Sequence, residues 1–178
     1  MQEQSNESKF PMLCRYSHKD NPIPNGWKFT LLRGHHGRNG YGILTRHKDD
    51  FYPTPPEAVE ALINAEKLPK DIWECACGDG AISKALIDSN HNVISTDLND
   101  FGYGESGVDF LMETKPLAPA IVTNPPYKLA NEFVIKCMDM KLPYFAMLLR
   151  LAFLEGKQRR QEIYNRQPPA RVHVFSER

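Results

Sequence analysis

The most specific chemical signal in the sequence is the tetrapeptide Asn124-Pro125-Pro126-Tyr127. The two prolines restrict the backbone and remove two amide donors, so the Pro125 carbonyl becomes part of a rigid corner of hydrogen-bond acceptors. An amino group whose lone pair is delocalised is a poor nucleophile. The Asn124 side-chain oxygen and the Pro125 carbonyl can accept its two hydrogens and turn its lone pair toward an electrophilic methyl group. Tyr127 offers a flat surface on which a planar base or amide can stack.

These roles predict transfer of a methyl group to nitrogen without a strong base, because the proton can leave after the transfer. The competing interpretation is an ordinary proline-rich turn. That interpretation explains the two prolines, but it explains neither the asparagine before them nor the aromatic residue after them. We therefore expect the catalytic residues to be Asn124, Pro125, Pro126 and Tyr127.

A second candidate site is the glycine-containing segment from Glu74 to Gly80. Gly78 and Gly80 permit a tight turn and let a ligand approach the backbone closely. Ser83 stands where the third glycine of a dinucleotide-binding fingerprint would fall, which argues against a nicotinamide enzyme. Asp97 follows the next apolar run, where an acidic residue can accept hydrogen bonds from the two hydroxyl groups of a ribose. The alternative for Asp97 is a solvated aspartate at the end of a strand.

Alternating strands and helices are predicted to position these residues. Thr54 and Glu57 form a capping-box pair at the start of a helix that runs to about residue 66, with a proline at its first position. Further helices are expected over 81–88, 129–140 and 155–165, and strands over 71–76, 92–97, 120–124, 144–149 and 170–175. This alternation predicts an α/β domain with a mainly parallel sheet, whose ligands bind at the carboxyl ends of the strands.

The length of 178 residues allows one domain and a tail. Lys and Arg total 22, as do Asp and Glu, which excludes a uniformly basic nucleic-acid coat and an acidic disordered chain. The charges are segregated, with a net charge of +3 over 1–50, −8 over 51–127 and +5 over 128–178. Residues 1–50 are rich in Asn, Gly, His and Pro, so we expect them to form a flexible basic arm.

Neither a metal site nor a membrane segment is expected. The cysteines and histidines match no zinc-binding spacing, and Cys75 and Cys77 stand one residue too close together for a zinc-type pair. The longest nearly apolar stretch, 144–154, is shorter than the roughly 20 residues of a membrane helix. The N-terminus lacks the apolar core of a signal peptide, which favours a cytoplasmic protein.

An ordered set of motifs resembles that of the S-adenosylmethionine-dependent amino-methyltransferases, most closely the phage and prophage-type DNA adenine-N6 methyltransferases. The motifs are Tyr52-Pro53-Thr54-Pro55, the segment 74–80, Asp97, Asp109-Phe110-Leu111 and Asn124-Pro125-Pro126-Tyr127. The resemblance covers about residues 50–155, and the stretch 148–156 is also similar to the phage-type group. It implies a Rossmann-like methyltransferase fold over 51–178 and S-adenosylmethionine as the cofactor. It also implies adenine N6 in DNA as the acceptor and, for a phage-encoded protein, the host cytoplasm as the location.

The resemblance further implies roles for individual residues. Cofactor contacts are expected from Thr54, Glu74, Cys75, Ala76, Gly78, Gly80, Asp97, Leu98, Asp109 and Phe110. Thr54 and the segment 74–80 would hold the methionine portion, and Asp97 would bind the ribose. Asp109 would bind the adenine amino group, while Leu98 and Phe110 would enclose the adenine ring.

The basic flanks predict a nucleic-acid partner, with DNA favoured. Candidate phosphate contacts are Arg33, Arg38, Arg46, Lys48, Arg150, Lys157, Arg159, Arg160 and Arg166. The alternative for the basic residues of 157–160 is the solvated face of a helix. Two other functions stay open: the same transfer to RNA or to a protein glutamine, and a non-catalytic protein that retains only the cofactor cleft.

The C-terminal region departs from the family pattern. Family members usually complete the sheet with an antiparallel hairpin, whereas here 171–175 is the last predicted strand and the sequence ends at Arg178. We therefore expect an incomplete C-terminal hairpin. The edge beside the strand 144–149 would then be open and would invite self-association.

Overall fold

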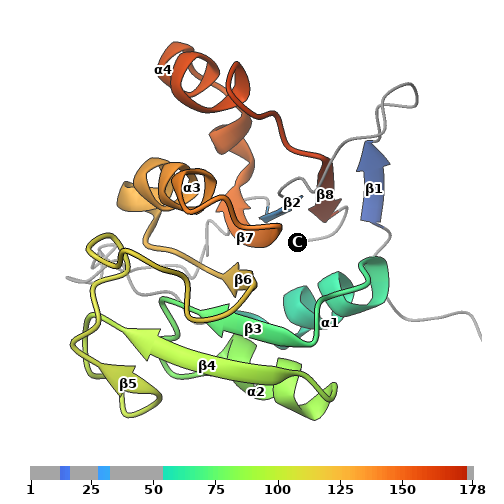
Figure 1. The fold of residues 1–178 in the computed structure, drawn as a ribbon. Coiled ribbons are helices and arrows are strands. Elements are labelled where there is room, and N and C mark those ends of the chain that lie inside the picture. Colours follow the sequence, from blue (N-terminus) through green and yellow to red (C-terminus); the bar gives the residue numbers. More distant parts are fainter. Residues whose placement is uncertain (1–12, 17–27, 33–53, 176–178) are drawn as a thin grey trace, which may run out of the picture.

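The computed structural model describes residues 54–175 in full and the backbone of two earlier strands, at 13–16 and 28–32 (Figure 1). Within these residues, eight strands form a sheet in the order β1-β8-β2-β7-β6-β3-β4-β5. Neighbouring strands run parallel except for β1 and β8, which are antiparallel. The expected α/β architecture with a mainly parallel sheet is therefore confirmed.

The strands are β1 (Leu13–Tyr16), β2 (Lys28–Leu32), β3 (Asp71–Glu74), β4 (Asn92–Asp97), β5 (Glu105–Ser106), β6 (Ala120–Thr123), β7 (Tyr144–Arg150) and β8 (Arg171–Phe175). The α-helices are α1 (Pro56–Ala65), α2 (Ala81–Asp88), α3 (Ala130–Asp139) and α4 (Lys157–Arg159). Short 3₁₀ turns η1 (Tyr127–Leu129) and η2 (Leu151–Leu154) precede α3 and α4, and a π-helical turn η3 (Arg160–Tyr164) continues α4. The predicted helices and strands from residue 56 onward are present, with small differences at their ends, but the helix expected over 155–165 is α-helical only over 157–159 and then π-helical. The short strand β5 was not predicted.

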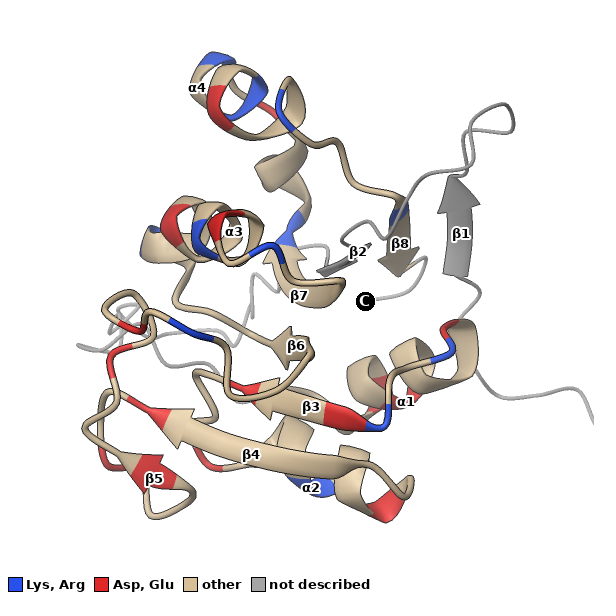
Figure 2. Ribbon diagram, in the orientation of Figure 1, with Lys and Arg blue, Asp and Glu red and all other residues tan. Residues whose placement is uncertain are grey.

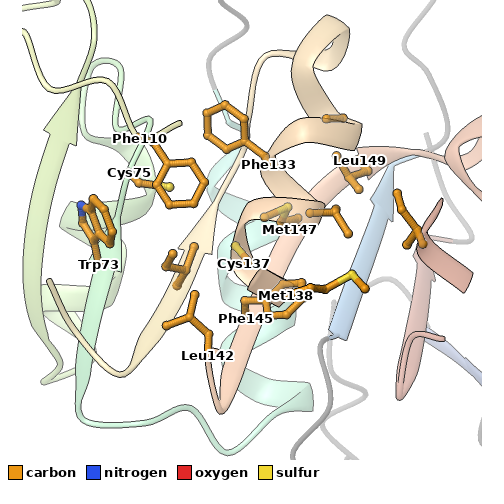
Figure 3. Packing of buried hydrophobic residues seen from close by; sticks show 14 of the residues in the cluster. Trp73, Cys75, Phe110, Phe133, Cys137, Met138, Leu142, Phe145, Met147 and Leu149 are labelled. Carbon is orange, nitrogen blue, oxygen red and sulfur yellow. The ribbon is translucent and has the colours of Figure 1, made fainter. Parts of the chain in front are cut away.

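Helices cover both faces of the sheet, with α1 and α2 on one face and α3 on the other (Figure 1). Side chains alternate along β7 accordingly: Phe145 and Met147 pack with α3, whereas Tyr144 and Ala146 pack with α1 and α2. The larger cluster, on the α3 face, is shown in Figure 3. Central strands that are covered on both faces read as continuous apolar runs, as β6 and β7 do.

The edge of β7 that we expected to be open is paired, so that expectation is wrong. Strand β2 runs parallel to β7 over five residue pairs, from Lys28 with Ala146 to Leu32 with Arg150. Strand β8 pairs with the other side of β2 instead of lying beside β7. Pairing with β2 provides hydrogen-bond partners for backbone N–H and C=O groups of β7. Such groups are costly to bury without partners. The rest of the expected arm over 1–50, with Arg33, Arg38, Arg46 and Lys48, lies outside the described residues, as do Tyr52 and Pro53.

The order in which strands are added to the sheet changes side between the parallel neighbours β3 and β6. From β3 the chain continues through α2 to β4, and from β6 it continues through α3 to β7 on the opposite side. Ligands of open α/β sheets bind at such a switch point, outside the carboxyl ends of the strands. Glu74, Asp97 and Asn124 stand at the ends of these strands, so the topology brings together residues that are far apart in the sequence.

A buried ion network lies away from these strand ends and ties α1 to β8. Glu66, which follows α1, accepts hydrogen bonds from Arg171 at 2.5 and 2.7 Å, and its carboxylate lies 2.7 Å from Nε2 of His173. The side chains of Glu66 and His173 are only 2% and 1% exposed. The other ring nitrogen of His173 has no hydrogen-bond partner in the described structure. Glu66 is therefore the hydrogen-bond partner of a buried imidazole as well as of a guanidinium.

Replacement of Glu66 by Ala should destabilise the fold. We expect the free energy of unfolding to fall by about 3 kcal/mol, the lower end of the cost for a buried pair because Arg171 is partly exposed. Urea denaturation followed by circular dichroism measures this change. The control is Asp139→Ala, which breaks an exposed pair with Arg166 and should cost about 1 kcal/mol or less. Equal effects of the two substitutions would contradict the assignment.

Candidate functional site

A cavity of about 450 Å³ opens at the carboxyl ends of β3, β4 and β6. Its volume lies in the range of about 300–1,000 Å³ that is typical of small-molecule sites. All of the residues expected to bind a cofactor or act in catalysis line this cavity, with the exception of Gly80. The structure thus brings the glycine segment, Asp97, Asp109-Phe110 and Asn124-Pro125-Pro126-Tyr127 to one place.

The glycine segment forms a tight turn between β3 and α2. Gly78 and Gly80 both have positive φ angles, of 53° and 80°, which other residues rarely adopt. Gly78 lines the cavity, whereas Gly80 faces the ring of Tyr103, which a Cβ atom at this position would overlap. The ammonium group of Lys84 lies 4.8 Å from the centroid of the same ring. Gly80 is therefore needed for the packing of the loop 99–107 and not as part of the cavity wall.

Asp97 is held by backbone amides at the end of β4. Its two carboxylate oxygens accept hydrogen bonds from the amides of Gly78 and Asn99, each at 2.9 Å. The residue is 7% exposed and lines the cavity. An ionised carboxylate offers about four acceptor positions, so each oxygen retains capacity for a further donor. This arrangement fixes the carboxylate in place and allows it to accept hydrogen bonds from a ligand with two neighbouring hydroxyl groups.

Glu74 is a buried carboxyl group at the end of β3. It contacts the hydroxyl of Ser83, which lies 2.6 Å from the hydroxyl of Ser95. Burial raises the pKa of Glu74 to about 8, against the lowering effect of the Ser83 hydrogen bond. Near neutral pH the carboxyl group is therefore protonated for much of the time, and a cation beside it would favour its ionised form.

Cys75 and Ala76 follow Glu74 in the cavity wall. The Cys75 side chain is 2% exposed and belongs to the apolar core beneath the cavity. Burial raises the pKa of its thiol well above the usual value, with a contribution from Cys137. The thiol is thus uncharged, and Cys75 contributes a packing surface and not a nucleophile.

The two residues expected to enclose an adenine ring differ in exposure. Leu98 is 56% exposed and can offer its side chain to a ligand. Phe110 is 2% exposed, because its ring packs against Trp73 at 5.3 Å and against Phe133 at 4.8 Å between centroids (Figure 3). Phe110 is therefore chiefly a core residue that reaches the cavity wall. The carboxylate of Asp109 accepts a hydrogen bond from the Leu111 amide at 2.9 Å, which fixes its position in the wall.

The candidate acceptor corner, Asn124 and Pro125, directly follows β6. The Pro126 carbonyl accepts a hydrogen bond from the Leu129 amide at 2.9 Å, whereas the Pro125 carbonyl has no such partner within the described residues. Pro125 is buried and lines the cavity next to Asn124. The amide nitrogen of Asn124 donates to the hydroxyl of Thr54 at 3.1 Å.

The capping box predicted at the start of α1 is not formed. The helix begins at Pro56 with Pro55 as its N-cap, and no side chain caps it. Thr54 lies just before this cap, and its hydroxyl is the acceptor of the Asn124 amide instead. The sequence pattern was ambiguous because a threonine near a helix start can serve either the helix or a neighbouring loop.

Tyr127 lies beside Arg150, a basic residue of the C-terminal flank. The guanidinium of Arg150, at the end of β7, is 4.4 Å from the centroid of the Tyr127 ring.

Figure 2 shows acidic residues around β3, β4 and β5 and basic residues on α4. Arg159 is occupied by the carbonyls of Ala152 and Glu155. Arg166 is occupied by Asp139, so the structure leaves Arg150, Lys157 and Arg160 as the better candidates for phosphate contacts in this flank.

Several cavity residues were not anticipated from the sequence. They include Phe101 from the loop after β4, Val108 from the segment after β5, Lys128 and Leu129 from η1, and Phe133 from α3. Lys128 and Leu129 directly follow Tyr127, so proximity to the motif is a signal that could have found them. Phe101 and Phe133 carry no such signal, because their approach to the cavity depends on how the loop and helix pack.

The part of the chain that the structure describes holds no cluster of three or more His, Cys, Asp or Glu side chains arranged for a metal ion. Within the same residues, no helix combines the length and the apolar character that crossing a membrane requires. The sequence matches no protein-family model and no curated protein.

The raised pKa of buried Glu74 should make the free energy of unfolding depend on pH. Its pKa is about 4.5 when unfolded and about 8 when folded, so folding takes up a proton between these values. Its contribution to the free energy of unfolding is fully present below about pH 4.5. It is lost as the pH rises to about 8, by up to about 1.4 kcal/mol per pH unit.

Urea denaturation at a series of pH values, without ligand, measures this component. In Glu74→Gln the decline between pH 4.5 and 8 should be smaller than in the wild type. Glu60→Gln removes an exposed carboxylate of α1 and serves as the control, which should keep the wild-type slope. An unchanged slope in Glu74→Gln would show that the Glu74 carboxyl group does not cause the loss of stability with rising pH.

Proposed function

We propose that the chain transfers a methyl group from S-adenosylmethionine to an exocyclic amine, with adenine N6 in DNA as the favoured acceptor. The observation that carries this proposal is one cavity that holds both the acceptor corner Asn124-Pro125 and the amide-anchored carboxylate of Asp97. In this interpretation, the α/β domain is a Rossmann-like methyltransferase fold. The proposal thus combines a nucleoside-binding group and an amine-orienting group, which the topology brings to one sheet edge.

The residues of the cavity fit the expected cofactor. Asp97 can accept hydrogen bonds from both ribose hydroxyls, because each of its oxygens has only one backbone donor. The second carboxylate of the wall, Asp109, suits an amino group of the adenine. Glu74 lies next to the glycine turn, where a positively charged methionine portion would favour its ionised form. Leu98 supplies exposed apolar surface for the adenine ring.

The acceptor corner would act on the amino group of the substrate. The bound cofactor supplies an electrophilic methyl group on a positively charged sulfur. The Asn124 oxygen and the Pro125 carbonyl accept the two amine hydrogens, which directs the nitrogen lone pair away from its ring. Tyr127 supplies a stacking surface for a base that has left the double helix or belongs to a single strand.

A nucleic-acid acceptor is favoured by the cation next to the stacking residue. Arg150 is exposed, and its guanidinium lies over the ring of Tyr127, which lines the cavity. A base stacked on Tyr127 brings a phosphate group with it, and arginine is suited to bind phosphate. A protein glutamine carries no such charge. Transfer to RNA uses the same features, so the acceptor must be identified by assay.

Asn124→Ala is the direct test of the acceptor corner. With methyl-labelled S-adenosylmethionine and adenine-containing DNA, the wild type should form N6-methyladenine, and the variant should be at least about 100-fold slower. Loss of one acceptor leaves the amine misdirected but leaves the cofactor contacts in place, so affinity for S-adenosylmethionine should change little.

The matched control is Asn92→Ala, at the exposed start of β4 and distant from the cavity wall, which should keep wild-type activity. Parallel reactions with RNA and with a glutamine-containing protein identify the acceptor class. Labelled protein without labelled nucleic acid would contradict the DNA assignment, and binding of S-adenosylmethionine without any transfer would indicate a non-catalytic protein.

Arg150→Ala should weaken the use of DNA more than the chemical step. We expect a several-fold higher KM for DNA, a nearly unchanged kcat, and a slope of log affinity against log salt that is smaller by about 0.9. Lys67→Ala removes one exposed cation at the opposite end of the sheet and is the control. An unchanged KM and salt slope in Arg150→Ala would show that Arg150 only supports the Tyr127 ring.

A further inference from the structure

A side-chain hydrogen bond connects Thr54 to Asn124 in the acceptor corner. Its hydroxyl accepts a hydrogen bond from the amide nitrogen of Asn124 at 3.1 Å, across a separation of 70 residues. Thr54 is 8% exposed and lines the same cavity as Asn124. It does not cap α1, since no side chain caps that helix. The hydroxyl therefore forms part of the cavity wall and does not stabilise the start of the helix.

The contact determines which end of the Asn124 amide is available to a substrate. A side-chain amide is planar, so a fixed nitrogen also fixes the direction of its oxygen. Removal of the Thr54 hydroxyl takes away an acceptor of this nitrogen, which makes it easier for the amide to rotate about its last single bond and present N–H groups to the substrate amine. Two donor groups would then face each other, and the corner would no longer accept an amine hydrogen.

We infer that Thr54 is a positioning residue, which holds the Asn124 amide so that its oxygen faces the amine that receives the methyl group. This inference rests on the proposed function. It assigns Thr54 a role different from the one that the family resemblance implies, which is contact with the methionine portion of the cofactor. The two roles predict different kinetic effects, because one concerns the orientation of the acceptor and the other the affinity for the cofactor.

The experiment compares Thr54→Val, which keeps the shape but cannot accept a hydrogen bond, with Thr54→Ser, which keeps the hydroxyl. We expect kcat of Thr54→Val to fall by about 10- to 100-fold, the effect of losing one hydrogen bond in a buried site. Its KM for DNA and its affinity for S-adenosylmethionine, measured by calorimetry, should stay within about twofold of the wild type. Thr54→Ser should restore most of kcat, and Thr114→Val, an exposed position outside the cavity wall, is the matched control.

Other kinetic outcomes contradict the inference. Weaker affinity for S-adenosylmethionine with an unchanged kcat at saturation would make Thr54 a cofactor contact. Equal losses in Thr54→Val and Thr54→Ser would indicate a packing effect. Thermal unfolding of each variant identifies any loss of activity that comes from a less stable fold.

A second measurement does not require activity. In nitrogen-15 NMR spectra, the side-chain amide signals of Asn124 are those absent from Asn124→Ala. In Thr54→Val they should shift and exchange with water faster than in the wild type, whereas in Thr54→Ser they should not. Unchanged signals in Thr54→Val would overturn the inference. A wild-type chain that transfers no methyl group would contradict the proposed function, and these spectra would still decide whether Thr54 holds the amide.

Discussion

The parallel pairing of β3 with both β4 and β6 is the constraint on which the candidate site depends. These pairings place Glu74, Asp97 and Asn124 at one edge of the sheet, although they are separated by long stretches of sequence. Trp73 reinforces the arrangement, since its fully buried indole donates a hydrogen bond from β3 to the Thr96 hydroxyl on β4 at 2.9 Å. A shift of one residue in either pairing would turn the side chains of the strand to the opposite face and separate the site residues.

The two halves of the cavity are fixed by different means. On the β4 side, the carboxylate of Asp97 is held by backbone amides of two loops. On the β6 side, prolines restrict the backbone, and the Asn124 side chain is held by a residue that precedes α1. Both sides therefore present polar groups whose orientation is set before a ligand binds, and such preorganised groups lose little entropy on binding.

The charge pattern of the sequence has a structural counterpart. The acidic middle segment supplies the carboxyl groups of the cavity, while basic residues stand at the end of β7 and on α4 (Figure 2). Zero net charge of the whole chain thus conceals a division between a cavity that contains carboxyl groups and a basic C-terminal flank. Within this flank, Arg159 and Arg166 are bound to carbonyl and carboxylate oxygens of the protein, whereas the guanidinium of Arg150 lies over the Tyr127 ring.

The sequence was most informative where one pattern determines local structure. Helix α2 and strand β4 have the predicted bounds, because the glycine turn and the alternation of apolar residues leave few alternatives. Strand β2 was missed, since Lys28–Leu32 lies in a segment rich in Asn, Gly, His and Pro and its pairing with β7 is a long-range property. Long-range packing also decided the outcome at Phe110, which lies mostly in the core, and at Gly80, which faces Tyr103. The local sequence pattern predicts Thr54 as a helix cap, whereas in the structure its hydroxyl contacts Asn124, which is 70 residues away in the sequence.

The proposed function requires the cavity at the ends of β3, β4 and β6 to bind S-adenosylmethionine. Calorimetric titration of the whole chain with S-adenosylmethionine, and separately with a nicotinamide dinucleotide, measures this binding. We expect saturable binding of one S-adenosylmethionine per chain and no binding of the dinucleotide. No heat with S-adenosylmethionine, or saturable binding of the dinucleotide instead, would contradict the proposed function.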